Sequence, residues 1–179
     1  MIIELSNKIL ILFILFVIVY SCNDKETTAP TEENLLVNTS FENNGRFSSG
    51  GWTLPSQSDS SSDVPPNGGY FSLIMEAGNP PESAYIKVPV KTQFNKFKLT
   101  FWSKYSVVEG KAVLSLIRSG AVIKSMSILV EDIIWQSYTI QDTFTVATGD
   151  SFMVQFNGGI AQLFPSKTYF DLCQLQGIE

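Results

Sequence analysis

Few side chains in this 179-residue chain could carry out catalytic chemistry. The sequence contains no histidine, which excludes a Ser-His-Asp or Cys-His nucleophile and leaves only thiolates and carboxylates as zinc ligands. Hydrolysis by paired carboxylates needs two acids roughly 5 to 9.5 Å apart. No pattern pairs the acidic residues, most of which lie in or beside expected turns: Glu76, Glu82, Glu109, Glu131, Asp132, Asp142 and Asp150. We therefore expect that the protein is not an enzyme. The alternative, a carboxylate-based hydrolase, would require two acids converging in a cleft.

Trp102 is the most informative candidate for a binding residue. Residues 96–105 alternate apolar and polar side chains, a two-residue period that indicates a half-buried strand. Trp102 interrupts this alternation, because it falls on the side otherwise made of lysine and threonine. A flat aromatic ring on a polar face can pack against the apolar side of a sugar ring.

Gln155 and Asn157 are the expected polar partners of that ring. Residues 151–157 also alternate, and both amides fall on the polar side. Amides can bind the hydroxyl groups of a sugar. If the two polar faces adjoin, Trp102, Gln155 and Asn157 form a sugar-binding site. Alternatively, Trp102 packs beneath a long loop such as residues 55–69, which are rich in serine, proline and glycine.

The remainder of the chain after residue 34 predicts short strands separated by turns, without a helix. Glycine, asparagine and proline clusters mark the turns. Nine strands at this spacing predict a single all-β domain, an antiparallel β-sandwich spanning residues 34–179. The expected strands are 35–41, 70–75, 84–90, 96–105, 111–118, 122–130, 136–146, 151–157 and 168–176.

The first 21 residues have the order of an export signal. Lys8 precedes an apolar run over residues 9–20, which as a helix would reach roughly 18 Å. This is too short for a hydrocarbon core of ~30 Å. The run ends in Val19-Tyr20-Ser21-Cys22, which resembles the lipobox of bacterial lipoproteins, and the resemblance implies that Cys22 is acylated, as with palmitate, and becomes the mature N-terminus. The alternative is an ordinary secretory signal peptide in which Cys22 is incidental.

Residues 22–33 are expected to be a flexible stalk between the lipid and the domain, because they are polar and include Pro30. Asp24-Lys25-Glu26 resembles signals that direct some lipoproteins to the cell exterior. We therefore expect a protein anchored to the outer membrane of a bacterial envelope through acylated Cys22, with exposure at the cell surface. A net charge of −5 argues against a nucleic-acid partner. With Cys22 acylated, Cys173 has no partner for a disulfide, and we expect it to be a small buried strand residue.

Several short motifs resemble the CenC-like, galactose-binding-like group of carbohydrate-binding modules. The likeness extends over almost all of residues 34–179. It rests on Asn34-Leu35-Leu36-Val37-Asn38-Thr39-Ser40-Phe41-Glu42, Gly51-Trp52, Gly68-Gly69-Tyr70-Phe71-Ser72-Leu73, Leu99-Thr100-Phe101-Trp102-Ser103-Lys104, Trp135, Phe144-Thr145-Val146 and Tyr169-Phe170-Asp171. The resemblance implies a jelly-roll topology and non-catalytic recognition of a glycan. The alternative function is a structural or accessory lipoprotein that contacts another envelope protein and has no affinity for sugar.

The same resemblance implies a structural calcium ion, because members of this group often hold one where the first and last strands meet. Glu42 and Asp171 occupy the corresponding motif positions and are the expected side-chain ligands. Leu172 stands where a second aspartate is common, so this chain offers one carboxylate fewer to an ion that takes six to eight oxygens. The alternative is that Glu42 accepts hydrogen bonds from turn amides and Asp171 pairs with a nearby lysine.

Overall fold

The computed structural model describes residues 33–160 and 165–178. The chain divides into two compact units, Met1–Thr31 and Glu32–Glu179, and the described residues belong to the second. The signal peptide predicted for residues 1–21, the lipidation site Cys22 and nearly all of the stalk predicted for residues 22–33 lie outside the described residues. No helix in the described part is long and apolar enough to cross a membrane.

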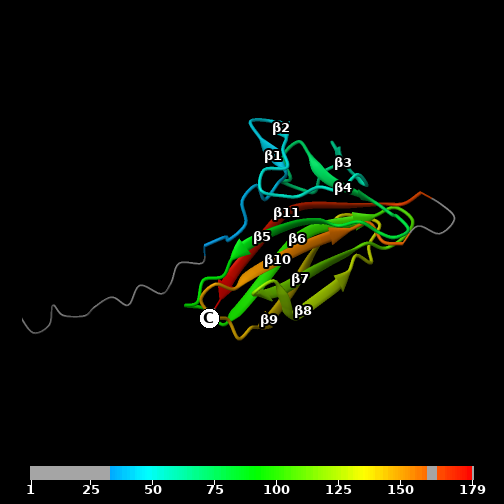
Figure 1. Ribbon diagram of the computed structural model, residues 1–179. Coiled ribbons are helices and arrows are strands. Elements are labelled where there is room, and N and C mark those ends of the chain that lie inside the picture. Colours follow the sequence, from blue (N-terminus) through cyan, green and yellow to red (C-terminus); the bar gives the residue numbers. More distant parts are fainter. Residues whose placement is uncertain (1–32, 161–164, 179) are drawn as a thin grey trace, which may run out of the picture. The chain divides into compact units, whose positions relative to one another are not determined.

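Two antiparallel sheets make up the domain (Figure 1). One has four strands in the order β5-β10-β7-β8, and the other has five in the order β3-β4-β11-β6-β9. A small hairpin, β1-β2, forms a third sheet. The strands are β1 (Glu42–Asn43), β2 (Arg46–Phe47), β3 (Ser58–Ser61), β4 (Ser72–Glu76), β5 (Ala84–Pro89), β6 (Lys96–Tyr105), β7 (Lys111–Arg118), β8 (Ala121–Leu129), β9 (Gln136–Thr143), β10 (Ser151–Asn157) and β11 (Lys167–Ile178). The predicted all-β antiparallel jelly-roll sandwich is confirmed.

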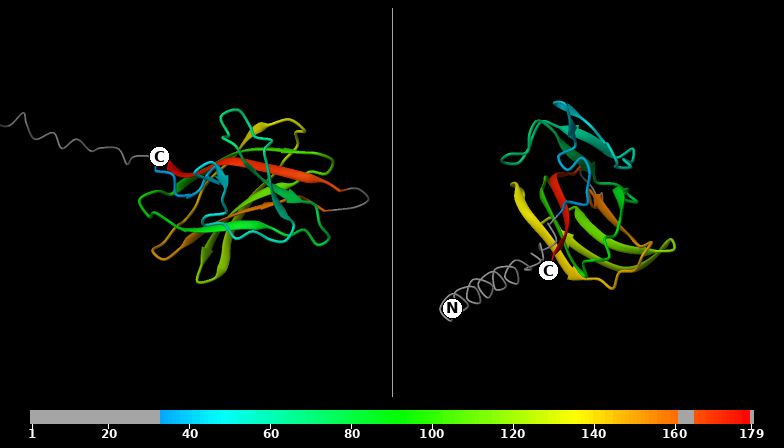
Figure 2. Two further views of the ribbon diagram at one scale, coloured as in Figure 1. Left: turned by 90° about the horizontal axis from the view of Figure 1, so that it is seen from above. Right: turned by 90° about the vertical axis from the view of Figure 1, so that its left-hand side faces the viewer.

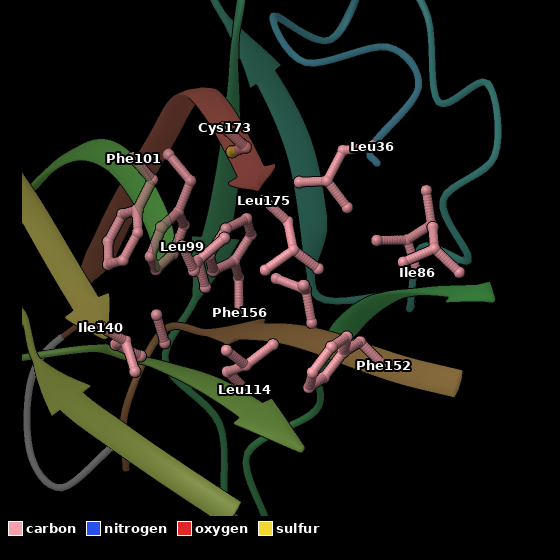
Figure 3. Packing of buried hydrophobic residues seen from close by; sticks show 14 of the residues in the cluster. Leu36, Ile86, Leu99, Phe101, Leu114, Ile140, Phe152, Phe156, Cys173 and Leu175 are labelled. Atoms are coloured by element: carbon pink, nitrogen blue, oxygen red, sulfur yellow. The ribbon is translucent and has the colours of Figure 1, made fainter. Parts of the chain in front are cut away.

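The core lies between the two sheets and is rich in aromatic rings (Figure 3). The ring of Phe156 stacks on Trp52 at 5.2 Å and on Phe170 at 4.3 Å between centroids. Phe97 and Phe101 of β6 are fully buried on the same side of their strand. Each such ring removes a large apolar surface from water, which is the dominant force that holds the sheets together.

Three strand predictions agree with the structure in both bounds, namely β6, β7 and β10. The strand predicted for residues 35–41 is wrong, because Asn38 and Phe41 have positive φ angles of 52° and 53°, which extended strands do not allow. Leu36 and Phe41 nevertheless pack in the core. The loop predicted for residues 55–69 contains β3, which pairs with β4.

The chain termini of the described domain and four of its turns lie at opposite ends of the sandwich. Asn34 bridges to Gln176 near the end of β11, so the described chain enters the domain beside its C-terminus. The turns that follow β4, β6, β8 and β10 lie at the opposite end, which Figures 1 and 2 show on the far side from the C-terminus. The twelve residues of β11, at ~3.3 Å each, separate the two ends by roughly 40 Å.

Candidate functional site

Trp102 lies on the outer face of the five-stranded sheet and is partly exposed. In the sheet register it is opposite Ser137 of β9 and Asp171 of β11. The next row along the same face contains Thr100, with Thr139 and Gln174 as its neighbours. We call Trp102, Thr100, Ser137, Thr139 and Gln174 the Trp102 surface. It joins one indole to hydroxyl and amide groups on an otherwise polar sheet face.

The loop of residues 62–71 lies over the same outer face, where Gly68 covers Asp171, the register partner of Trp102. Its Asp63 forms an ion pair with Lys104 and accepts a 2.9 Å hydrogen bond from Trp135 Nε1. Lys104 Nζ lies 5.4 Å and 5.0 Å from the ring centroids of Trp135 and Tyr169. Burial disfavours the charge of Asp63, yet the hydrogen bonds from Lys104 and Trp135 lower its pKa overall. This cluster holds the loop against β6.

The structure does not bring Gln155 and Asn157 together with Trp102. Both amides belong to β10 in the four-stranded sheet, whereas Trp102 belongs to β6 in the five-stranded sheet. The alternation of β10 turns Phe156 into the core, so Gln155 and Asn157 are on the outward side of their sheet. The expected three-residue site is therefore not formed, because the two polar faces lie on opposite sides of the sandwich.

Asn157 instead lines a pocket at the end of the four-stranded sheet. The pocket has a volume of about 290 Å³ and is bordered by Pro81, Val108, Glu109, Lys111, Leu129, Asn157, Gly159 and Ile160. We call it the Asn157 pocket. The sequence analysis missed it, because its walls combine three turns with the ends of β7, β8 and β10, and the sequence pattern does not show that these segments meet.

Glu42 and Asp171, the expected metal ligands, lie close to the same loop. Glu42 Oε1 accepts hydrogen bonds from the backbone amides of Tyr70 and Phe71, the latter at 2.6 Å. A Cβ atom added to Gly69 would lie 2.4 Å from Glu42 Oε1, and one added to Gly68 would lie 2.6 Å from Asp171 Oδ2. Two adjacent glycines thus allow the backbone to pass directly over both carboxylates.

Asp171 is fully buried, and its Oδ2 atom has no hydrogen-bond partner among the described residues. Its Oδ1 atom accepts a hydrogen bond from the Leu172 amide. Burial, with a smaller contribution from the negative charge of Glu42, raises the pKa of Asp171 to about 8. Glu42 does accept hydrogen bonds from turn amides, as the alternative predicts. Asp171 forms no ion pair with a lysine among the described residues, and its charged neighbour is Glu42.

This arrangement fits a calcium ion in part. An orphaned buried carboxylate oxygen beside a second carboxylate is a feature that a divalent cation would stabilise. No group of three or more acidic or cysteine side chains converges anywhere in the described residues. Backbone carbonyls and water would therefore have to supply most of the remaining ligands.

Most acids considered for hydrolysis already have partners. The described acids that form ion pairs are Glu76 with Lys167, Asp142 with Lys124, and Asp150 with Arg118. Those that accept hydrogen bonds from neutral groups are Glu82, from Ser56 and the Gln57 amide, and Asp132, from Tyr138. Cys173 is fully buried, as expected, and burial raises its thiol pKa well above the usual value.

Solved structures share this fold at low sequence identity. The enzymatically active domain of tailspike protein 4 from bacteriophage CBA120 matches with a TM-score of 0.63 and 14% identity, covering 81% of this chain but only 21% of that one. The CBM22-1 xylan-binding domain of Xyn10C from Paenibacillus barcinonensis matches with a TM-score of 0.57 and 15% identity, covering 84% and 98% of the two chains. TmCBM61, solved with β-1,4-galactotriose, matches with a TM-score of 0.55 and 19% identity, covering 82% and 99%. The fold is thus that of carbohydrate-binding-module jelly rolls. No protein-family model and no curated protein matches the sequence.

Proposed function

We propose that this domain binds a glycan without chemically changing it, through the Trp102 surface. The observation that carries the proposal is a partly exposed indole on a face of hydroxyl and amide side chains. The likeness to a xylan-binding domain and to a galactotriose-bound module supports the same class of ligand.

Two neighbouring rows of residues on the Trp102 surface would make different contacts with the glycan. The Trp102 ring would pack against the apolar face of a pyranose and would remove both surfaces from water. Thr100, Thr139 and Gln174 would exchange hydrogen bonds with hydroxyl groups of the next sugar unit. Lys104 is already engaged by Asp63 and two aromatic rings, so it would border the site and not bind the sugar.

The burial and the hydrogen-bond partners of the acidic side chains support a non-catalytic role. Glu42 and Asp171, the acidic pair beneath Gly68 and Gly69, are covered by backbone and do not line an open cleft. Five of the other acids considered for hydrolysis are held in ion pairs or hydrogen bonds, namely Glu76, Glu82, Asp132, Asp142 and Asp150.

The same proposal includes the lipid anchor and the location. Acylated Cys22 would attach the protein to the outer membrane of a bacterial envelope, and residues 22–33 would space the domain from the lipid. Because the described chain enters beside the C-terminus, the opposite end of the sandwich would be free to meet ligands. A net charge of −5 does not favour binding to nucleic acid.

A structural calcium ion would bind between Glu42 and Asp171. It would take the place of the proton that buried Asp171 otherwise keeps and would hold loop 62–71 to the last strand. The orphaned Oδ2 of Asp171 is the atom that supports this assignment.

The glycan proposal is tested with a fragment of residues 32–179, the compact unit that contains both sheets and the core. The fragment is screened on a glycan array, and hits are measured by affinity gel electrophoresis. We expect retention by at least one polysaccharide and roughly tenfold weaker binding by Trp102→Ala, the factor that corresponds to about 1.4 kcal/mol. Absence of any retained polysaccharide, or unchanged binding by the variant, would contradict the proposal.

A second candidate function is contact with another envelope protein. Ile133 and Ile134, in the turn between β8 and β9, are 67% and 63% exposed. Two adjacent exposed isoleucines beside Trp135 offer apolar area to a protein partner. A pull-down from native membranes that yields a stoichiometric protein, lost with Ile133→Ser and Ile134→Ser, would favour this function over glycan binding.

A further inference from the structure

The Asn157 pocket is built by close approaches between backbone segments. A Cβ atom on Gly159 would lie 2.2 Å from the Glu109 carbonyl oxygen, and one on Gly110 would lie 2.4 Å from that of Asn157. The hydroxyl of Ser166 accepts hydrogen bonds from the amides of Val107 and Val108, at 3.3 Å and 2.7 Å, which fixes the turn that forms one wall. The pocket is therefore bounded by tightly packed turns whose shape the glycines and Ser166 determine.

A single buried amide faces this pocket. Asn157 is only 5% exposed, and it is the one amide side chain among the residues that line the pocket. An amide offers both a donor and an acceptor, so the position favours a ligand that supplies the complementary pair. Lys111 lies opposite Asn157 in the register, and Leu129 lies opposite Lys111.

The other walls restrict the ligand further. Pro81, Val108, Leu129 and Ile160 are aliphatic, and no aromatic ring lines the pocket. A plain sugar ring would therefore find no flat surface on which to stack. Glu109 and Lys111 carry opposite charges at the rim, so a neutral ligand is favoured over an ionic one. A volume of about 290 Å³ is at the lower end of the range for small-ligand sites.

We propose that the Asn157 pocket binds the acetamido group of an N-acetylated sugar. The acetamido carbonyl accepts from the Asn157 amide, the acetamido N–H donates to it, and the methyl group packs against Val108 and Leu129. This site is on the opposite sheet from the Trp102 surface and does not depend on glycan binding there.

The test uses saturation-transfer-difference NMR on the full chain in lipid nanodiscs, with N-acetylglucosamine as the probe. Glucose is the matched sugar without an acetamido group, and empty nanodiscs are the blank. We expect a signal from the acetamido methyl protons and none above the blank from glucose. Asn157→Leu should weaken the methyl signal at least fivefold. Gln155→Ala, two residues earlier on the same face, should change it less than twofold.

Ile160→Ser provides a second variant in case Asn157→Leu does not fold. Ile160 is 56% exposed, so its replacement removes apolar wall with little cost to the core, and we expect roughly a threefold weaker methyl signal. Equal signals from glucose and N-acetylglucosamine, or a signal unchanged by both pocket variants, would overturn the proposal. A methyl signal lost with Trp102→Ala but kept with Asn157→Leu would place the probe on the Trp102 surface, which would refute the pocket and leave the proposed function intact.

Discussion

The two outer faces of the sandwich are organised in different ways. On the five-stranded face, loop 62–71 covers the buried carboxylate of Asp171 and is held by Asp63. On the four-stranded face, Thr53 bridges to Tyr85 at the edge, and the side chains of β10 stay partly open as far as the Asn157 pocket. On the five-stranded face, some polar residues attach a loop and the Trp102 surface beside them remains open. On the four-stranded face, the polar residues remain available as far as the end of the sheet.

The largest expected effect comes from filling the space beneath loop 62–71. Gly69 has a φ of +75°, and an added Cβ would lie 2.4 Å from Glu42 Oε1. We expect Gly69→Ala to lower the free energy of unfolding by about 2–4 kcal/mol, because it combines backbone strain with displacement of the Glu42 carboxylate from the amides of Tyr70 and Phe71. Gly45→Ala is the matched control, since Gly45 has a φ of +70° but nothing within 4 Å of its added Cβ, and it should cost about 1 kcal/mol. Equal losses in urea unfolding would show that the loop does not lie tightly over Glu42.

Replacement of the orphaned carboxylate sharpens the comparison next. Asp171→Asn replaces an acid that must keep a proton at pH 7.5 by an amide that needs none. The metal-free protein should gain about 2–3 kcal/mol, which allows for the cost of the amide's own unpartnered N–H at this position. Added calcium should stabilise the wild-type protein, by about 2.7 kcal/mol at a hundredfold excess over Kd, but not the variant. Asp59→Asn, on β3 in the same sheet but separated from β11 by β4, should keep the calcium effect. Equal calcium responses in wild type and Asp171→Asn, followed by thermal unfolding with EDTA as the metal-free reference, would remove the metal site.

The same residue predicts a pH dependence. The pKa of Asp171 is about 8 in the folded protein and ~3.9 in an unfolded chain. Between these values the unfolded chain has lost the proton that the folded protein keeps, so a rise in pH favours unfolding. We expect the metal-free protein to lose about 1–2 kcal/mol between pH 6.5 and pH 8, and Asp171→Asn to show a flatter profile in urea titrations. A wild-type stability that rises over this range would contradict the burial of this acid.

The smallest expected effect concerns the attachment of the loop. Lys104→Met removes the cation that contacts Asp63, Trp135 and Tyr169, and should cost about 0.5–1 kcal/mol because these groups are partly exposed. Lys98→Met, on the same strand and face, is the control and should cost less. Amide hydrogen exchange should rise in loop 62–71 for the first variant alone; unchanged exchange there would show that other contacts hold the loop.

Strict alternation of apolar and polar residues correctly predicted which side chains of a strand are buried. The sequence near turns did not allow such a prediction. The two-residue period of β6 correctly placed Phe97 and Phe101 inside and Trp102 outside. The same rule placed Gln155 on an outer face, but alternation cannot indicate which sheet a strand joins, so the distance between Trp102 and Gln155 was not predictable. The positive φ angles of Asn38 and Phe41 likewise depend on contacts with distant segments, such as the hydrogen bond from the Cys173 amide to the Thr39 carbonyl.

The central claim, glycan binding on the five-stranded face, is tested most directly by two aromatic substitutions compared on one polysaccharide. Trp102→Ala alters that face, and Tyr85→Ala alters the opposite one, where Tyr85 is paired with Gln155. Affinity gel electrophoresis of the fragment of residues 32–179 should show roughly tenfold weaker binding for Trp102→Ala and less than a twofold change for Tyr85→Ala. Loss of binding with Tyr85→Ala and full retention with Trp102→Ala would contradict the account.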